Sequence, residues 1–230
     1  MSKESGVARQ YVKRAVTASL GLVLCGFGVY LQVQASIGTA PWNALNQGAA
    51  NTFPISFGVA SNLIAVLVVI ADLLLREPIG LGTLLDACIV GWTADLCTFL
   101  ALLPAQTERP LQILCLLAGM LITCVGQYFY MGTALGCGPR DALLVALGKR
   151  FRRVSIGVVN LGISVVVLAA AYALGAPIGI GTLITVCFTG VMMDAVFHLL
   201  RFDARSVRHE SLAETFRTVF RTGEKGLPEP

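Results

Sequence analysis

Six long apolar segments, separated by short polar stretches, dominate the chain. They run over about residues 15–35, 57–75, 79–102, 111–133, 155–174 and 177–200. Each can form a helix of roughly 20 residues, the length that crosses a bilayer. Two shorter and less apolar segments, about 38–52 and 136–150, follow the first and the fourth. The pattern predicts an all-α fold, that of a polytopic helical membrane protein.

The second half of this pattern repeats the first. At an offset of 98 residues, the matches are Gly21/Gly119, Gly28/Gly126, Tyr30/Tyr128, Gly38/Gly136, Pro41/Pro139, Ala44/Ala142, Leu45/Leu143 and Asn62/Asn160. At an offset of 99, Pro78–Gly80 matches Pro177–Gly179, Gly82–Leu84 matches Gly181–Leu183, Gly91 matches Gly190 and Asp95 matches Asp194. Chance similarity between apolar helices would align Leu and Val, not Gly, Pro and Asp in order. The sequence therefore predicts two homologous membrane repeats, 15–103 and 110–200.

The orientation of the repeats depends on whether the short segments cross the bilayer. If they cross, each repeat has four spans and the repeats are parallel; if they do not, each has three spans and the repeats are inverted. The loop 51–54 carries no charge, whereas its counterpart 149–153 carries four basic residues, which favours inversion because basic loops stay in the cytoplasm. About 15 residues also reach only about 22 Å, short of a ~30 Å hydrocarbon core. We favour inverted repeats, each of three spanning helices plus one short re-entrant or half-helix, with the parallel arrangement as the alternative.

Both termini are expected in the cytoplasm, as an N-terminal segment 1–14 and a tail 201–230. In the tail, Leu212, Phe216, Val219 and Phe220 have helical spacing and are flanked by Arg208, Arg217 and Arg221. This predicts an amphipathic helix over about 207–221 on the inner leaflet. A loosely ordered tail is the alternative.

Composition excludes most other classes of protein. Of 230 residues, 56% are hydrophobic and 13% are charged, and the mean hydropathy is +0.77, so the chain is too apolar and charge-poor for an ordinary soluble domain. Its net charge of +4 comes from basic residues between apolar runs, and we expect no nucleic-acid partner. No nucleophile motif, Walker loop, dinucleotide fingerprint or metal-ligand spacing is present. We expect no enzyme activity, no cofactor and no metal.

The two short segments carry the first candidate site. Pro41, Trp42 and Asn43 in one correspond to Pro139, Arg140 and Asp141 in the other. Proline is favoured at the first position of a helix, so each segment is predicted to start a half-helix whose N-terminus carries partial positive charge and free N–H donors. Arg140 suits a carboxylate or phosphate; Asp141 either caps its helix, pairs with Arg140 or carries a coupling ion. A structural cap and ion pair, with Trp42 as an interfacial anchor, is the alternative.

Further polar residues lie within the apolar helices. Asn62 and Asn160 either bond neighbouring helices together or contact the substrate. Asp95 and Asp194 either join Asp141 as ion-coupling candidates or cap a neighbouring half-helix near the interface. Asp86 has Thr185 as its counterpart, so it breaks the symmetry.

We interpret the chain as a secondary transporter or exporter of a small polar or anionic solute, with a midplane site at the two half-helix N-termini, since paired interrupted segments point to such sites. A non-transporting membrane scaffold or accessory subunit is the second hypothesis, and a channel-like facilitator is a third. The expected partners are the lipid bilayer and the solute, and a homodimer stays open because no motif decides it.

The Gly-x-x-Pro-Trp-Asn and Gly-Cys-Gly-Pro-Arg-Asp segments, 38–43 and 136–141, resemble the signature of the YczE/YitT-like family of bacterial multipass membrane proteins. The likeness covers roughly residues 12–200. It implies a multi-pass protein of the bacterial cytoplasmic (inner) membrane, and it gives little about the substrate. In that family an acid often follows the Pro-Trp pair, whereas Asn43 stands here.

Overall fold

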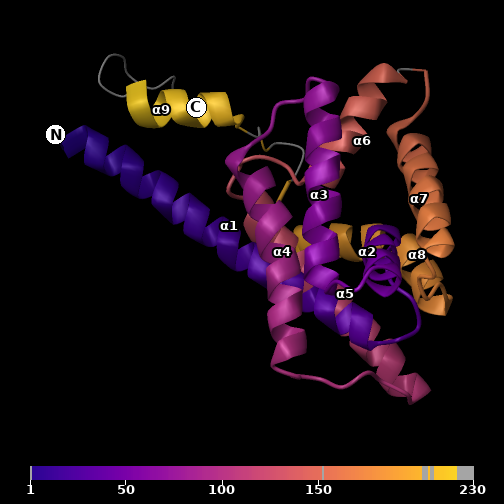
Figure 1. Ribbon diagram of the computed structural model, residues 1–230. Helices are drawn as coiled ribbons and strands as arrows, with labels where there is room; N and C mark the ends of the chain where they lie inside the picture. Colours follow the sequence, from indigo (N-terminus) through magenta and orange to yellow (C-terminus); the bar gives the residue numbers. More distant parts are fainter. Residues whose placement is uncertain (1, 152, 204–206, 208–209, 222–230) are drawn as a thin grey trace.

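The structure is a computed structural model that describes residues 2–151, 153–203, 207 and 210–221. All regular structure in this part of the chain is helical (Figure 1). The helices are α1 (Ser2–Gln34), α2 (Pro41–Thr52), α3 (Phe57–Leu74), α4 (Leu81–Phe99), α5 (Arg109–Met131), α6 (Pro139–Arg150), α7 (Ile156–Ala173), α8 (Ile180–Leu199) and α9 (Leu212–Arg221).

Six helices are long and apolar enough to cross a membrane: α1 from Arg9 onward, α3, α4, α5, α7 and α8. They match the six predicted apolar segments. The helix α1 begins at Ser2, well before residue 15, because nothing in the polar residues 2–14 stops a helix. The helices α2 and α6 have only 12 residues each, about 18 Å of length.

The two halves form the same helices for the same local reasons. Pro41 and Pro139 occupy the first turns of α2 and α6. Ser56 and Ser155 cap α3 and α7, each accepting a hydrogen bond from the backbone N–H three residues later. Left-handed backbone conformations also recur in pairs: Ser36 with Ala134, Gly38 with Gly136, and Arg76 with Gly175.

These caps correct one predicted match. Because Ser56 and Ser155 both start an 18-residue helix, the offset is already 99 residues at this point. Asn160 therefore corresponds to Ser61, and Asn62 corresponds to Leu161. The one-residue slip lies in the loops before the two serines, not between the asparagines and the next helix.

The helices α1 and α5 form the central contact, and they run antiparallel. The ideal Cβ position of Gly21 lies 2.7 Å from the carbonyl oxygen of Gly126, and that of Gly28 lies 2.6 Å from the carbonyl oxygen of Gly119. Since Gly21 corresponds to Gly119 and Gly28 to Gly126, the contact is symmetric under exchange of the halves. Small residues permit this backbone approach.

Each half also docks the start of its last long helix on the other half. The backbone N–H of Gly82 donates to the Leu135 carbonyl at 2.8 Å, and that of Gly181 donates to the Ile37 carbonyl at 2.8 Å. Likewise α2 packs on α7 and α3 packs on α6. The halves are therefore interlocked through equivalent contacts rather than placed side by side.

One contact breaks this symmetry. Between α3 and α4, Ser56 Oγ donates a hydrogen bond to Asp95, the Gly58 N–H donates to Asp95 at 2.7 Å, and Gly91 faces Asn62. The equivalent helices α7 and α8 diverge (Figure 1), and apart from neighbouring atoms of their own helices no described atom lies within 4 Å of the Cβ positions of Gly157 and Gly190. Asp194 is exposed there.

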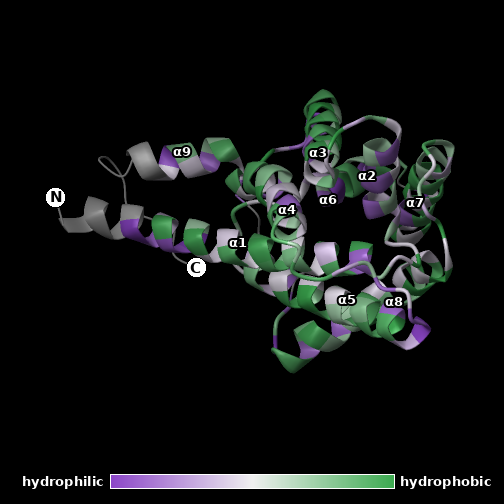
Figure 2. Cartoon of the chain, turned by 60° about the horizontal axis from the view of Figure 1, so that its bottom comes forward, coloured by the Kyte–Doolittle hydropathy of each residue, from purple (hydrophilic) through white to green (hydrophobic). Residues whose placement is uncertain are grey.

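The outer surface is apolar, as expected of helices in lipid. Large hydrophobic side chains are exposed on all six long helices, for example Leu20, Leu67, Trp92, Leu114, Val166 and Leu183. Figure 2 shows α3 as largely hydrophobic and places hydrophilic residues on α2. The polar positions of the short helix therefore lie among apolar ones.

The tail helix α9 begins at Leu212 rather than near residue 207. A capping box starts it: the Glu214 N–H donates to Ser211 Oγ at 3.2 Å, and the Ser211 N–H donates to Glu214 Oε2 at 2.8 Å. Phe216 is exposed, whereas Arg208 and the side chains of Val219, Phe220 and Arg221 lie outside the described part, as do residues 222–230 of the predicted tail.

Candidate functional site

The first turns of α2 and α6 meet around the Arg140 guanidinium. Arg140 Nη1 donates a long hydrogen bond of 3.5 Å to Asn43 Oδ1. The Arg140 Cζ atom lies 5.4 Å from the centre of the Trp42 ring, within the range of a cation–π interaction. Trp42 and Arg140 are counterparts in the repeat, so the structure brings together one pair of equivalent positions at which the two halves differ.

Asn46 provides a further hydrogen bond to Arg140. With its amide assigned so that the oxygen faces the guanidinium, Asn46 Oδ1 accepts from Arg140 Nη2 at 3.2 Å and from Ser61 Oγ at 3.0 Å. Asn46 is 0% exposed. Sequence reasoning missed Asn46, although its position one turn after Asn43 places both amides on one face of α2.

Two carboxylates flank Arg140. A Cβ atom at Gly138, just before α6, would lie 2.8 Å from Asp86 Oδ2 and 3.6 Å from Asp141 Oδ2. Both acids interact electrostatically with Arg140. Asp86 comes from α4 and Asp141 from the first turn of α6. Asp86 was visible in the sequence only as an acid without a partner in the other repeat.

Two further buried polar groups near these helices have no hydrogen-bond partner among the described residues. The hydroxyl of Tyr130, 1% exposed, packs against Gly82, one turn before Asp86 on α4. Both carboxylate oxygens of Asp72, 0% exposed, lie near the end of α3. Buried polar groups normally have a hydrogen-bond partner, so Tyr130 and Asp72 are exceptions among the described residues.

An apolar groove of about 460 Å³ begins at Trp42 and runs between α6 and α7. Leu143, Leu147, Ile163 and Val166 form much of its wall. The charged cluster thus has a hydrophobic surface beside it.

Pro41 and Pro139 start α2 and α6, next to the residues of this cluster, and are buried. With its amide nitrogen toward α4, Asn62 donates to the Ala87 carbonyl at 2.9 Å, which is the helix-bonding role. Asn160 is exposed on α7.

Of the three ion-coupling candidates, only Asp141 lies beside Arg140. Asp95 caps the start of α3 through Ser56 and Gly58, and Asp194 is exposed on α8. The contacts of Asp95 are those of a helix cap, the alternative given for it above. The helix that it caps is the long helix α3, not one of the two short helices.

Residues 12–198 match the family of unknown function DUF6198. The chain belongs to the DUF6198 family. Relatives are the uncharacterized membrane protein YczE of Bacillus subtilis, 30% identical over 75% of this chain and 80% of its own length, and an uncharacterized protein of Haemophilus influenzae, 31% identical over 78% and 81%. No solved structure matches.

The DUF6198 match includes both signature segments, 38–43 and 136–141. It supports the YczE part of the predicted resemblance, since one relative carries that name. The YitT-like label is not supported. The chain is a membrane protein with several spans, consistent with its six long apolar helices and with the description of YczE.

Proposed function

We propose that this DUF6198 protein is a secondary transporter or exporter of a small polar or anionic solute, built from two inverted repeats. The observation that carries the proposal is the meeting of the two half-helix N-termini around Arg140, with Asn43, Asn46 and Trp42 holding it. Broken or short helices that end inside a bundle form the sites of many transporters.

Three contacts support inverted rather than parallel repeats. They are the hydrogen bonds from Gln106 N–H to the Gln34 carbonyl and from Thr52 Oγ1 to the Leu174 carbonyl, both 2.8 Å, and the ion pair of Lys149 with Glu77 at 2.7 Å. If α2 and α6 crossed the bilayer, each pair would have its members on opposite sides. A hydrocarbon core about 30 Å thick does not permit such contacts.

Charge supports the sidedness of this arrangement. In the inverted topology, the basic residues 149–153 and the two termini lie on the same side as Arg76, whereas loop 51–54 lies on the other side. This excess of basic residues on one side supports our proposal that both termini lie in the cytoplasm of a bacterial inner membrane.

The charges around Arg140 support coupling to protons. Arg140 faces two carboxylates, so an anionic solute beside the guanidinium raises the local negative charge. Protonation of Asp141 or Asp86 relieves that repulsion, because like charges nearby favour the neutral form of an acid. Solute binding and proton binding are then favourable together, as symport requires.

The test is transport by the full chain in proteoliposomes that contain a trapped pH-sensitive dye, challenged in turn with glutamate, succinate, sulfate and phosphate. We expect one of these solutes to change the internal pH. Arg140→Gln should reduce solute uptake at least tenfold, since it removes the charge that binds the anion, and Asp141→Asn should abolish coupled movement.

Arg150→Gln, at the far end of the same half-helix, is the matched control and should leave uptake unchanged. Each variant is first checked for a monodisperse, folded protein in detergent. If Arg140→Gln moves the solute as the natural chain does, or if none of the four anions is moved, the proposal of an anionic solute bound at Arg140 fails. Normal coupling in Asp141→Asn would make Asp141 structural.

A further inference from the structure

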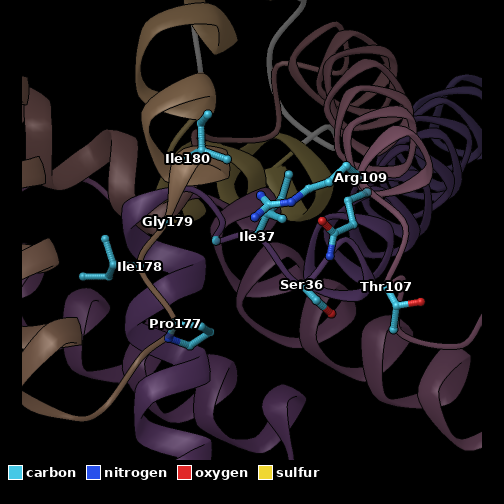
Figure 3. A pocket seen from close by; sticks show the side chains of 10 residues that line it. Ser36, Ile37, Thr107, Arg109, Pro177, Ile178, Gly179 and Ile180 are labelled. Carbon is cyan, nitrogen blue, oxygen red and sulfur yellow. The ribbon is translucent and has the colours of Figure 1, made fainter.

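A second pocket lies away from Arg140, at the end of the molecule where α1 finishes and α5 begins. It has a volume of about 430 Å³. Its walls are the loops Ser36–Gly38 and Pro177–Ile180, together with Thr107, Arg109 and Gln112. Figure 3 shows Arg109 extending from the start of α5 across the pocket toward Ile37.

The repeat places an equivalent pocket at the other end of the molecule, and there the chain fills it. Ala134–Gly136 corresponds to Ser36–Gly38, and Pro78–Leu81 corresponds to Pro177–Ile180. Glu210, in the tail before α9, lies against these two loops: its N–H donates to the Ala134 carbonyl at 2.9 Å, and its carbonyl oxygen lies 2.9 Å from the Cβ position of Gly80.

The Glu210 carboxylate is bound by two side chains of α1. Tyr11 Oη donates to Oε2 at 2.8 Å, and Arg14 Nη1 donates to Oε1 at 2.8 Å. Two residues further on, the Leu212 N–H donates to the Ile79 carbonyl at 2.7 Å. The filled pocket therefore binds a peptide segment by its backbone and by one carboxylate.

The positions that bind this carboxylate carry related chemistry in the empty pocket. At the offset of 98 residues, Arg109 stands for Tyr11 and Gln112 stands for Arg14. The empty pocket therefore also has one guanidinium, that of Arg109, which can bind a carboxylate. Gln112 is 8% exposed and its Oε1 has no partner among the described residues, which leaves a buried acceptor for an N–H group of the ligand.

We propose that the pocket between Arg109, Gln112 and the loops Ser36–Gly38 and Pro177–Ile180 binds a peptide-like carboxylate. Arg109 binds the carboxylate, and Gln112 Oε1 accepts an N–H from the adjoining amide. Ser36 and Ile178 stand where Ala134 and Ile79 accept the backbone N–H groups of the tail. This site is separate from the Arg140 cluster and stands whether or not the chain transports a solute.

The test is calorimetric titration of the full chain in nanodiscs with the peptide acetyl-Ala-Glu-Ser-Leu-amide, with its Gln analogue, and with glutarate. We expect the Glu peptide to bind and the Gln peptide to bind at least tenfold more weakly, because a charge-assisted hydrogen bond is lost. Arg109→Gln should weaken binding of the Glu peptide by the same factor. Glutarate carries a carboxylate but no amide, so it tests whether a free small acid binds this pocket. If glutarate bound as tightly as the Glu peptide, the predicted hydrogen bond from a ligand amide to Gln112 would be wrong.

Exchange of two residues between the pockets distinguishes binding at this site from binding at the pocket that holds Glu210. The double variant Arg109→Tyr with Gln112→Arg installs the residues that bind Glu210, and it should retain the preference for Glu over Gln. Arg14→Gln alters only the other pocket and should leave peptide binding unchanged. Equal affinity for both peptides, absence of binding by the natural chain, or loss of binding in Arg14→Gln but not in Arg109→Gln would overturn the proposal.

Discussion

At the scale of single residues, duplication and divergence together shape the Arg140 cluster. The two half-helices begin alike with Pro41 and Pro139, and the next residues differ as Trp42 and Arg140. The fold brings these two counterparts into contact, with the guanidinium beside the indole ring. Because these counterparts lie in contact, two arginines at the two positions would repel each other. Divergence to Trp42 removes that repulsion.

Glycine at the α1–α5 crossing gives a prediction for stability. In Gly28→Ala, the added Cβ atom would lie 2.6 Å from the Gly119 carbonyl oxygen and 2.8 Å from the Thr123 backbone nitrogen. We expect a loss of about 1–3 kcal/mol in the free energy of unfolding, the usual cost of overpacking, measured by thermal or SDS-induced unfolding in detergent.

The control is Gly162→Ala on α7, where no described atom outside the neighbouring part of the same helix lies within 4 Å of the Cβ position. Alanine is a better helix former than glycine by about 0.8–1.0 kcal/mol in helix interiors, so this variant should be neutral or slightly stabilised. Equal loss in both variants would mean that the close crossing of α1 and α5 is absent from the membrane-embedded protein.

At the scale of elements, the two pairs α3–α4 and α7–α8 have matching polar and small residues but different contacts. Ser56, Asp95 and Gly91 lie at a closed contact, whereas their counterparts Ser155, Asp194 and Gly190 lie apart. In the transporter that we propose, exchange of these two arrangements between the halves would open one side of the protein and close the other.

Cysteine pairs test this exchange in membranes, in a background without the seven natural cysteines. Ser56→Cys with Asp95→Cys should form a disulfide on mild oxidation, because the contact already exists. Ser155→Cys with Asp194→Cys should form one more slowly, as the protein visits the exchanged state. Tyr172→Cys with Asp194→Cys, at opposite ends of α7 and α8, should not react. If the pair at 155 and 194 never reacts, α7 and α8 do not close and the exchange does not occur.

At the scale of the whole molecule, the topology of the repeats is the property on which the transport proposal depends. Thr52 and Arg150 are counterparts that end α2 and α6. With a single cysteine at either position, intact cells are labelled with an impermeant maleimide. We expect labelling of position 52 from outside, and of position 150 only after the membrane is opened. Labelling of both positions from one side would mean parallel repeats.

Local sequence determined the helices and their order. Apolar runs of about 20 residues must hide their backbone groups in lipid as helices, and Pro41, Pro139, Ser56 and Ser155 mark where helices begin. The repeat was visible because Gly, Pro and Asp recur at fixed offsets. The predicted match of Asn62 with Asn160 was wrong, since it needs an offset of 98 and the helices that start after Ser56 and Ser155 are offset by 99.

Only the tertiary structure decided which residues meet. That Arg140 lies between Trp42, Asn43 and Asn46, that Asp86 joins Asp141, and that Glu210 fills one of two equivalent pockets all depend on contacts between segments far apart in sequence. Hydrophobic pattern fixes the faces of helices but not their partners, because any apolar face packs against any other. Which helices pack together is decided here by the close approach of α1 and α5 at glycines and by backbone hydrogen bonds between the two halves. These contacts form only when both halves are folded together.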